Sequence, residues 1–111
     1  MAQYSDQLDM VFTALADPTR RSVIGRLGRG PASVGDLARP SPMTLPSFMK
    51  HIHMLEGCGL IRTTKSGRVR TCKLERERLA VLDGWLADQR SIWEDRTDRL
   101  EQFVSHRNET S

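Results

Sequence analysis

The fold of this chain is decided by residues 44–74, which read TLPSFMKHIHMLEGCGLIRTTKSGRVRTCKL. The first half of this stretch has the apolar spacing of a helix with one buried face. That face is predicted to consist of Leu45, Phe48, Ile52 and Leu55. Thr44 is a suitable N-cap, and Pro46 falls in the first turn, where proline is tolerated. The sequence therefore predicts a capped amphipathic helix over residues 44–56.

The second half of the stretch predicts a β-hairpin with a basic tip. Gly57 and Gly59 end the helix, and two strands are expected over residues 60–65 and 68–74. Ser66-Gly67 is the expected tight turn between them. From Arg62 to Lys73 there are five basic residues and no acidic residue. A helix followed by a cationic hairpin is typical of proteins that bind duplex DNA.

Three further helices are predicted before this stretch. The apolar spacing in residues 8–15 predicts the first, with Ser5 or Asp6 as its N-cap. Asp17 caps the second and Pro18 takes its first helical position. Ser33 opens a short third helix.

The last predicted helix covers residues 76–104 and has more large apolar side chains than a small core can bury. Leu79, Leu86, Trp93 and Leu100 recur every seven residues, although Gln89 and Arg96 interrupt the neighbouring row. This pattern favours a dimer seam along this helix. A helix folded back on its own domain is the alternative. The predicted dimer-interface residues of this helix are Leu79, Leu82, Leu86, Trp93, Leu100 and Phe103.

Length, charge and cysteine content limit the class of protein. With 111 residues, the chain has room for one domain with one modest core. Residues 1–74 carry eleven Lys and Arg against five Asp and Glu, whereas residues 75–111 carry six against nine. The basic half is the half expected to face a polyanion. Two cysteines, no signal peptide and no membrane-spanning run predict a soluble cytoplasmic protein that does not contact membranes.

Three stretches in the order found here resemble the ArsR/SmtB family of bacterial repressors. They are Leu15-Ala-Asp-Pro-Thr-Arg-Arg, Met43-Thr-Leu-Pro-Ser-Phe-Met-Lys-His-Ile, and Leu55-Glu-Gly-Cys-Gly-Leu-Ile with the Gly67-Arg-Val-Arg turn. The resemblance covers nearly the whole chain and is closest to the branch that lacks the cysteine metal site. It implies a homodimeric winged helix-turn-helix repressor whose first and last helices form the dimer interface. The resemblance therefore adds Leu8, Val11 and Phe12 of the first helix to the predicted interface residues.

The resemblance places residues 44–56 in the major groove, where Ser47 and Lys50 match positions that carry short polar and basic groups. His51 matches a common family histidine, and packing and DNA contact are both open for it. Arg20 and Arg21 could contact the DNA backbone or pair with acids such as Asp17. The predicted DNA-binding residues are Thr44, Pro46, Ser47, Lys50, His51, His53, Arg62, Lys65, Arg68 and Arg70.

No metal site or cofactor is predicted. Residues 33–38, which correspond to the family's cysteine site, contain no cysteine. Asp95, His106 and Glu109 resemble part of the family's second metal site, but Trp93 stands where a further ligand is needed. Cys58 and Cys72 are expected to be small packing residues. A thiol switch stays open if Cys58 is exposed and its pKa is lowered.

The fold predicted from these observations is mainly α with a small β-hairpin (α+β), a winged helix-turn-helix of five helices and a two-stranded wing. Residues 1–111 form one domain, with a DNA-binding core over 4–75, a dimerisation helix over 76–104 and a frayed tail over 105–111. The expected function is a non-enzymatic transcriptional repressor whose partners are double-stranded DNA and a second copy of the chain. The alternatives are a metal- or thiol-responsive sensor with an unknown effector, and a protein-interaction module that uses the last helix.

Overall fold

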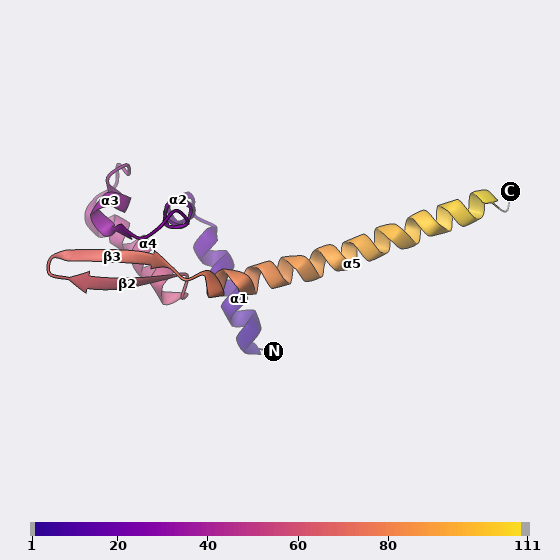
Figure 1. Cartoon of the computed structure of the whole chain (residues 1–111), viewed down its shortest axis with the longest axis horizontal. Helices are drawn as coiled ribbons and strands as arrows, with labels where there is room; N and C mark the ends of the chain where they lie inside the picture. The colour runs from indigo at the N-terminus through magenta and orange to yellow at the C-terminus, as the bar shows by residue number, and fades with distance from the viewer. Residues whose placement is uncertain (1, 110–111) are drawn as a thin grey trace. The chain divides into compact units, whose positions relative to one another are not determined.

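The computed structural model describes the backbone of residues 2–109 and the side-chain exposure of residues 6–104 (Figure 1). After Val81 the chain divides into two compact units. The elements in chain order are the helices α1 (Ala2–Leu15) and α2 (Pro18–Leu27), the strand β1 (Ala32–Ser33), the helices α3 (Val34–Ala38) and α4 (Leu45–Gly57), the strands β2 (Ile61–Ser66) and β3 (Val69–Leu74), and the helix α5 (Arg76–Glu109). Within residues 2–109 there are thus five helices and a β-hairpin, as predicted.

Three of the predicted helix caps are confirmed. The side chain of Asp17 accepts a hydrogen bond from the backbone N–H of Arg20, and those of Ser33 and Thr44 accept from residues 36 and 47 in the same way. The N-cap predicted for the first helix is wrong, because α1 begins at Ala2 and both Ser5 and Asp6 lie inside it. Neither residue is needed as a cap there, since the helical hydrogen bonding extends upstream of both.

The sheet has three antiparallel strands in the order β1-β3-β2. Ser66 pairs with Val69, so the turn residues are Gly67 and Arg68, and the predicted Ser66-Gly67 turn is wrong by one residue. Gly67 has φ +61, a left-handed conformation that glycine adopts without steric strain. β1 was not predicted, because two residues are too few to show strand periodicity.

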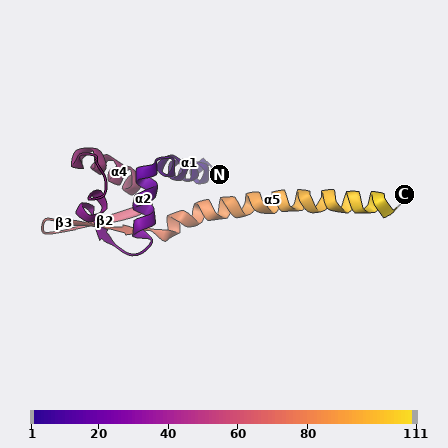
Figure 2. The ribbon, with the colours of Figure 1, turned by 90° about the horizontal axis from the view of Figure 1, so that it is seen from above.

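The core lies between α4, the sheet and the first two helices. Phe48, Ile52 and Leu55 are buried on the inner face of α4, and Val11, Leu60 and Cys72 join them. Leu45 was predicted to share this face but is 57% exposed. It is the first residue of α4, and helical side chains lean toward the N-terminus, so Leu45 points past the core. Figure 2 shows α2 lying across the sheet, where it contacts β3.

The second unit is the continuation of α5. The helix runs to Glu109, so residues predicted to fray after position 104 are helical as far as that residue. Most of its large apolar side chains are exposed, and Trp93 is 69% exposed. The other exposed apolar residues of this unit are Leu86, Ile92, Leu100, Phe103 and Val104. None of the described helices is long and apolar enough to cross a membrane.

Candidate nucleic-acid interface

The outer face of α4 carries small polar and basic side chains, as predicted. Ser47, Lys50 and His53 are exposed on successive turns, and Pro46 and Thr44 are exposed at the helix start. Among the described residues, neither Lys50 nor His53 makes an ion pair or a hydrogen bond through its side chain. Both basic groups are therefore free to contact an external acceptor.

The N-terminus of α4 is fixed by Thr44. Its hydroxyl accepts from the backbone N–H of Ser47 at 3.3 Å and donates to the Ser47 hydroxyl oxygen at 3.1 Å. Two hydroxyls thus lie together at the positive end of the helix dipole, an arrangement suited to a phosphate oxygen.

His51 lies on the flank of α4 and takes part in a network with α1 and α2. Its Nδ1 is 3.1 Å from a guanidinium nitrogen of Arg20 and 3.6 Å from a carboxylate oxygen of Asp17. Arg20 also donates to the backbone carbonyls of Ala14 at 2.7 Å and Thr13 at 3.1 Å. These contacts make His51 and Arg20 positioning residues that connect α4 to the junction of α1 and α2.

The same network influences the ionisation of Asp17. The backbone N–H of Arg20 donates to its carboxylate, which holds the pKa of Asp17 below its usual value, and the charges of His51 and Arg20 act in the same direction. Asp17 is therefore a charged N-cap for α2. Arg21 is occupied as well, because it donates to the backbone carbonyl of Leu15 at 2.8 Å.

The wing, formed by β2, β3 and the turn between them, presents its cations near the turn. Lys65 and Arg70 are cross-strand partners and lie on the same face of the hairpin. Arg68 is exposed in the turn itself. No described carboxylate lies within ion-pair distance of any of these three side chains. Like charges directly opposite each other repel, so an anion bound there would stabilise the tip.

Arg62 differs from the other wing cations. Its Nε lies 3.3 Å from a carboxylate oxygen of Glu75, at the end of β2 that is farthest from the turn. The sequence predicts that Arg62 contacts a phosphate. In the structure, the carboxylate of Glu75 already balances the charge of Arg62.

The wing is also attached to α4. The hydroxyl of Thr63 donates to the carboxylate of Glu56, which lies in the last turn of α4. Sequence reasoning missed this contact, because a Glu and a Thr separated by a glycine-rich turn carry no pattern of their own. The bond restrains the wing relative to α4.

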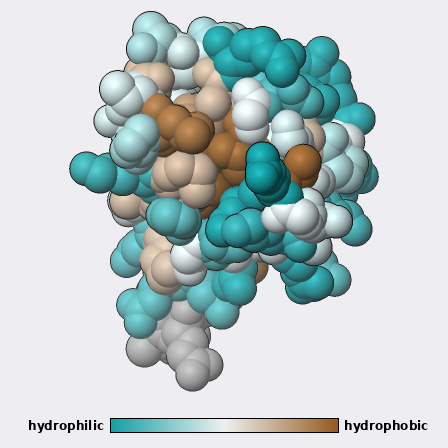
Figure 3. Space-filling model, turned by 90° about the vertical axis from the view of Figure 1, so that its left-hand side faces the viewer, coloured by the Kyte–Doolittle hydropathy of each residue, from teal (hydrophilic) through white to brown (hydrophobic). Residues whose placement is uncertain are grey.

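Figure 3 views this end of the molecule with the hairpin turn toward the reader, and hydrophilic residues surround a central group of apolar ones. The exposed large apolar side chains of the wing and of the α4 start are Val69 and Leu45. The cationic and polar groups described above thus share this end with a limited apolar surface.

Several known proteins that are similar to this chain in sequence and fold are transcriptional regulators. A family model described as a helix-turn-helix domain matches residues 15–64. The HTH-type transcriptional regulator Rv2034 of Mycobacterium tuberculosis is 38% identical over 74 residues, which are 67% of this chain and 69% of that protein. The ArsR family transcriptional regulator RHA00566 is 61% identical in sequence to this chain. Its crystal structure matches with a TM-score of 0.77, over 79% of this chain and 97% of that one. The chain belongs to the ArsR family of transcriptional regulators.

A third relative is informative about assembly. The homodimeric winged helix-turn-helix DNA-binding domain of Mb0332 from Mycobacterium bovis, described as a possible ArsR-family regulator, is 25% identical. Its structure matches with a TM-score of 0.65 over 80% of this chain and 85% of that one. The winged helix-turn-helix predicted for this ArsR-family chain is confirmed.

The cysteines of this ArsR-family chain are buried and reduced. Cys58 donates through Sγ to the carbonyl of Leu55 at 3.3 Å, and Cys72 has no exposed surface. Burial raises the pKa of the Cys72 thiol, and the charge of Glu56 adds to the rise. The expectation that both are packing residues agrees with this burial, and the condition set for a thiol switch at Cys58 is not met.

Residues 6–104 contain no group of three or more potential metal ligands. Asp95 pairs with Arg99 at 2.9 Å. The side chains of His106 and Glu109, the other two members of the partial set, lie outside the described residues.

The predicted dimer residues differ in how much of their surface is exposed in the protomer. Val11 is fully buried within the protomer and Leu8 nearly so, which leaves almost none of their surface for a partner, whereas Phe12 is 41% exposed. Leu79 and Leu82 are half-buried. The remaining four are exposed along α5 and are Leu86, Trp93, Leu100 and Phe103.

Proposed function

We propose that this ArsR-family regulator is a homodimeric repressor that binds a partly palindromic operator in double-stranded DNA. α4 enters the major groove, and the wing follows the backbone and the adjacent minor groove. The observation that carries the proposal is that unpaired cations occur on both elements while the Thr63–Glu56 hydrogen bond holds the elements together.

The proposed contacts differ in what they read. Lys50, Ser47 and His53 are positioned on the exposed face of α4 for base edges or phosphates. Thr44 and Pro46 lie at the helix start, where backbone N–H groups favour a phosphate. The wing residues Lys65, Arg68 and Arg70 supply charge to the backbone, and an arginine at the turn is suited to a narrow minor groove.

Two residues from the predicted set receive weaker roles. His51 already interacts with Arg20, so it orients α4 rather than reading DNA. Arg62 is paired with Glu75 and contributes less to phosphate binding than the cations near the turn.

The second copy is proposed to cover the apolar face of α5. A row of exposed apolar side chains that includes Trp93, Leu86 and Leu100 is costly to leave in water. The Mb0332 domain is homodimeric, which supports a dimer for this chain as well. Two α4 helices would then enter successive major grooves about 34 Å apart, and the bound dimer would exclude polymerase. Such a regulator acts on the chromosome in the cytoplasm.

Substitution of Lys50 tests the proposed reading role. Lys50→Ala is expected to weaken operator binding by about 1–3 kcal/mol if Lys50 contacts a base edge. The measurement is fluorescence anisotropy with a duplex from the promoter of the chain's own gene, because autoregulation is common in this family. Arg90→Ala, which removes one exposed positive charge from α5, is the matched control and is expected to bind normally. Equal affinities of the Lys50→Ala and Arg90→Ala proteins would remove Lys50 from the interface.

A further inference from the structure

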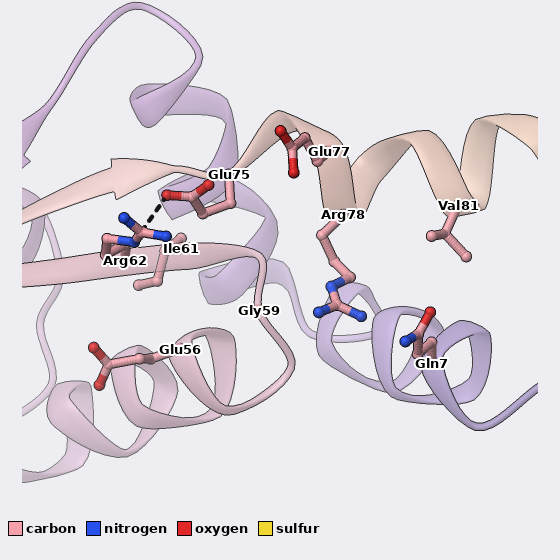
Figure 4. A pocket seen from close by; sticks show the side chains of 9 residues that line it. All are labelled: Gln7, Glu56, Gly59, Ile61, Arg62, Glu75, Glu77, Arg78 and Val81. Carbon is pink, nitrogen blue, oxygen red and sulfur yellow. Dashed lines mark ion pairs between the residues drawn. The ribbon is translucent and has the colours of Figure 1, made fainter. Parts of the chain in front are cut away.

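A pocket of about 560 Å³ lies within the first unit, apart from the proposed DNA contacts on the outer face of α4 (Figure 4). Its walls come from α1, the last turn of α4, the start of β2 and the first residues of α5. This volume is within the range of pockets that bind small molecules. Nothing described above requires a hollow at this place.

Some of the charged side chains that line the pocket already have a partner within the chain. Glu75 pairs with Arg62 at 3.3 Å, and Glu56 accepts a hydrogen bond from Thr63. Arg78 is different, because no described carboxylate lies within ion-pair distance of its guanidinium. Glu77 also lines the pocket, but Figure 4 shows its carboxylate pointing away from that guanidinium. Arg78 is therefore the cation at this site that lacks a partner among the described residues.

The guanidinium of Arg78 lies against the main chain at Gly59. A Cβ at Gly59 would lie 2.8 Å from Nε and 2.9 Å from one terminal nitrogen of Arg78, so the guanidinium rests on the bare backbone. Figure 4 shows it pointing into the space between Gly59 and Gln7. The side chain is half-buried, which strengthens its attraction for an anion compared with a fully solvated arginine.

We infer that this pocket binds a small organic carboxylate. The planar guanidinium of Arg78 would hold the carboxylate through paired N–H donors, and the amide of Gln7 would provide a further donor. Ile61 and Val81 supply an apolar surface for the body of the ligand. Since the carboxylates of Glu56, Glu75 and Glu77 also line the pocket, a monoanion fits better than a ligand of higher negative charge.

A ligand bound there would contact the elements that carry the wing, α4 and the start of α5 at the same time. It would stabilise the arrangement of these elements that it fits best, and it would change DNA affinity if the operator-bound arrangement differs. This regulatory part rests on the proposed function, whereas the binding of a carboxylate does not.

The direct test uses 2-naphthoate as the probe, titrated into the full chain by isothermal titration calorimetry. Its neutral and cationic counterparts, 2-naphthamide and 2-naphthamidine, have nearly the same shape. We expect 2-naphthoate to bind and the other two to bind more weakly. Tighter binding of 2-naphthamidine, or no heat from 2-naphthoate at millimolar concentration, would overturn the inference.

Two variants locate the binding to Arg78. Arg78→Gln is expected to weaken 2-naphthoate binding by at least about tenfold, since hydrogen bonds to a charged group are lost. Arg78→Lys keeps the positive charge but lacks the planar pair of donors. Its affinity for 2-naphthoate is expected to lie between those of the wild type and Arg78→Gln. Arg76→Gln removes an exposed charge from the same helix turn and is the control. Thermal unfolding of each variant confirms that it is folded, and unchanged affinity in folded Arg78→Gln would contradict the assignment.

Operator anisotropy with and without 2-naphthoate separates the two parts of the inference. A change in operator affinity in the wild type that is absent from Arg78→Gln would support regulation. Binding of 2-naphthoate through Arg78 with unchanged operator affinity would overturn the regulatory part of the inference. The assignment of the carboxylate-binding site would still stand. Binding of 2-naphthoate by a chain that binds no duplex would contradict the proposed function alone.

Discussion

Gly59 shows how one residue controls the junction between α4 and β2. It has φ +80, and the Arg78 side chain occupies the position where a Cβ would lie. Gly57, two residues earlier, ends α4 with open space around it and no positive φ. The two glycines look equivalent in the sequence, but only one of them is required by its surroundings.

Gly59→Ala is therefore expected to lower the free energy of unfolding by about 1–3 kcal/mol, because it combines backbone strain with displacement of Arg78. Gly57→Ala is the matched control, and alanine at a helix end should be neutral or stabilising by up to about 1 kcal/mol. Urea unfolding of both proteins checks the difference. Equal midpoints for the two variants would show that the conformation at Gly59 is not constrained.

At the residue scale, a contact can be predicted from the sequence when its two residues are close together in the chain. The caps at Asp17, Ser33 and Thr44 were predicted because each bonds to a residue three positions later. The contact between His51 and Arg20 spans 31 positions and could not be derived from the sequence, which left two roles open for the histidine.

At the scale of elements, α4 and the wing are joined by a side-chain hydrogen bond in addition to the packing of the core. Thr63 donates to Glu56, and Glu56 lies at the end of the helix proposed to read DNA. A winged helix-turn-helix depends on the relative orientation of these two elements, since each must contact a different groove. The hydrogen bond is therefore expected to matter for affinity as well as for stability.

Thr63→Val preserves the shape of the side chain and removes the donor. We expect it to lower the free energy of unfolding by about 1 kcal/mol and to weaken operator binding. Thr64→Val is the control, because the neighbouring hydroxyl is exposed and makes no hydrogen bond in the described part of the chain. Chemical unfolding and anisotropy measure the two effects, and identical behaviour of both variants would contradict the proposed restraint.

Most element boundaries followed from periodicity and from proline and glycine positions. The exceptions have physical causes. β1 forms only because β3 offers it an edge, and the turn moved to Gly67 and Arg68 because Ser66 pairs with Val69. The Thr63–Glu56 bond and the pocket at Arg78 depend on tertiary placement, which local sequence patterns do not encode.

At the scale of the whole molecule, the proposed dimer is what gives the exposed apolar side chains of α5 a partner. Trp93→Glu is expected to shift the chain from dimer to monomer, because it places a charge in the apolar row. Ser91→Glu adds the same charge two positions away, outside that row, and should leave the dimer intact. Analytical ultracentrifugation distinguishes them, and a dimeric Trp93→Glu protein would argue against this seam.

The central claim is that the dimer recognises a specific duplex, and the most direct test is fluorescence anisotropy over a range of salt concentrations. The promoter duplex of the chain's own gene is compared with a scrambled duplex. If each protomer neutralises about four phosphates, the logarithm of the affinity should fall with the logarithm of salt concentration with a slope of about −7. We predict tight binding that prefers the promoter. Equal, weak and steeply salt-dependent binding to both duplexes would mean that the wing and α4 provide only a cationic surface.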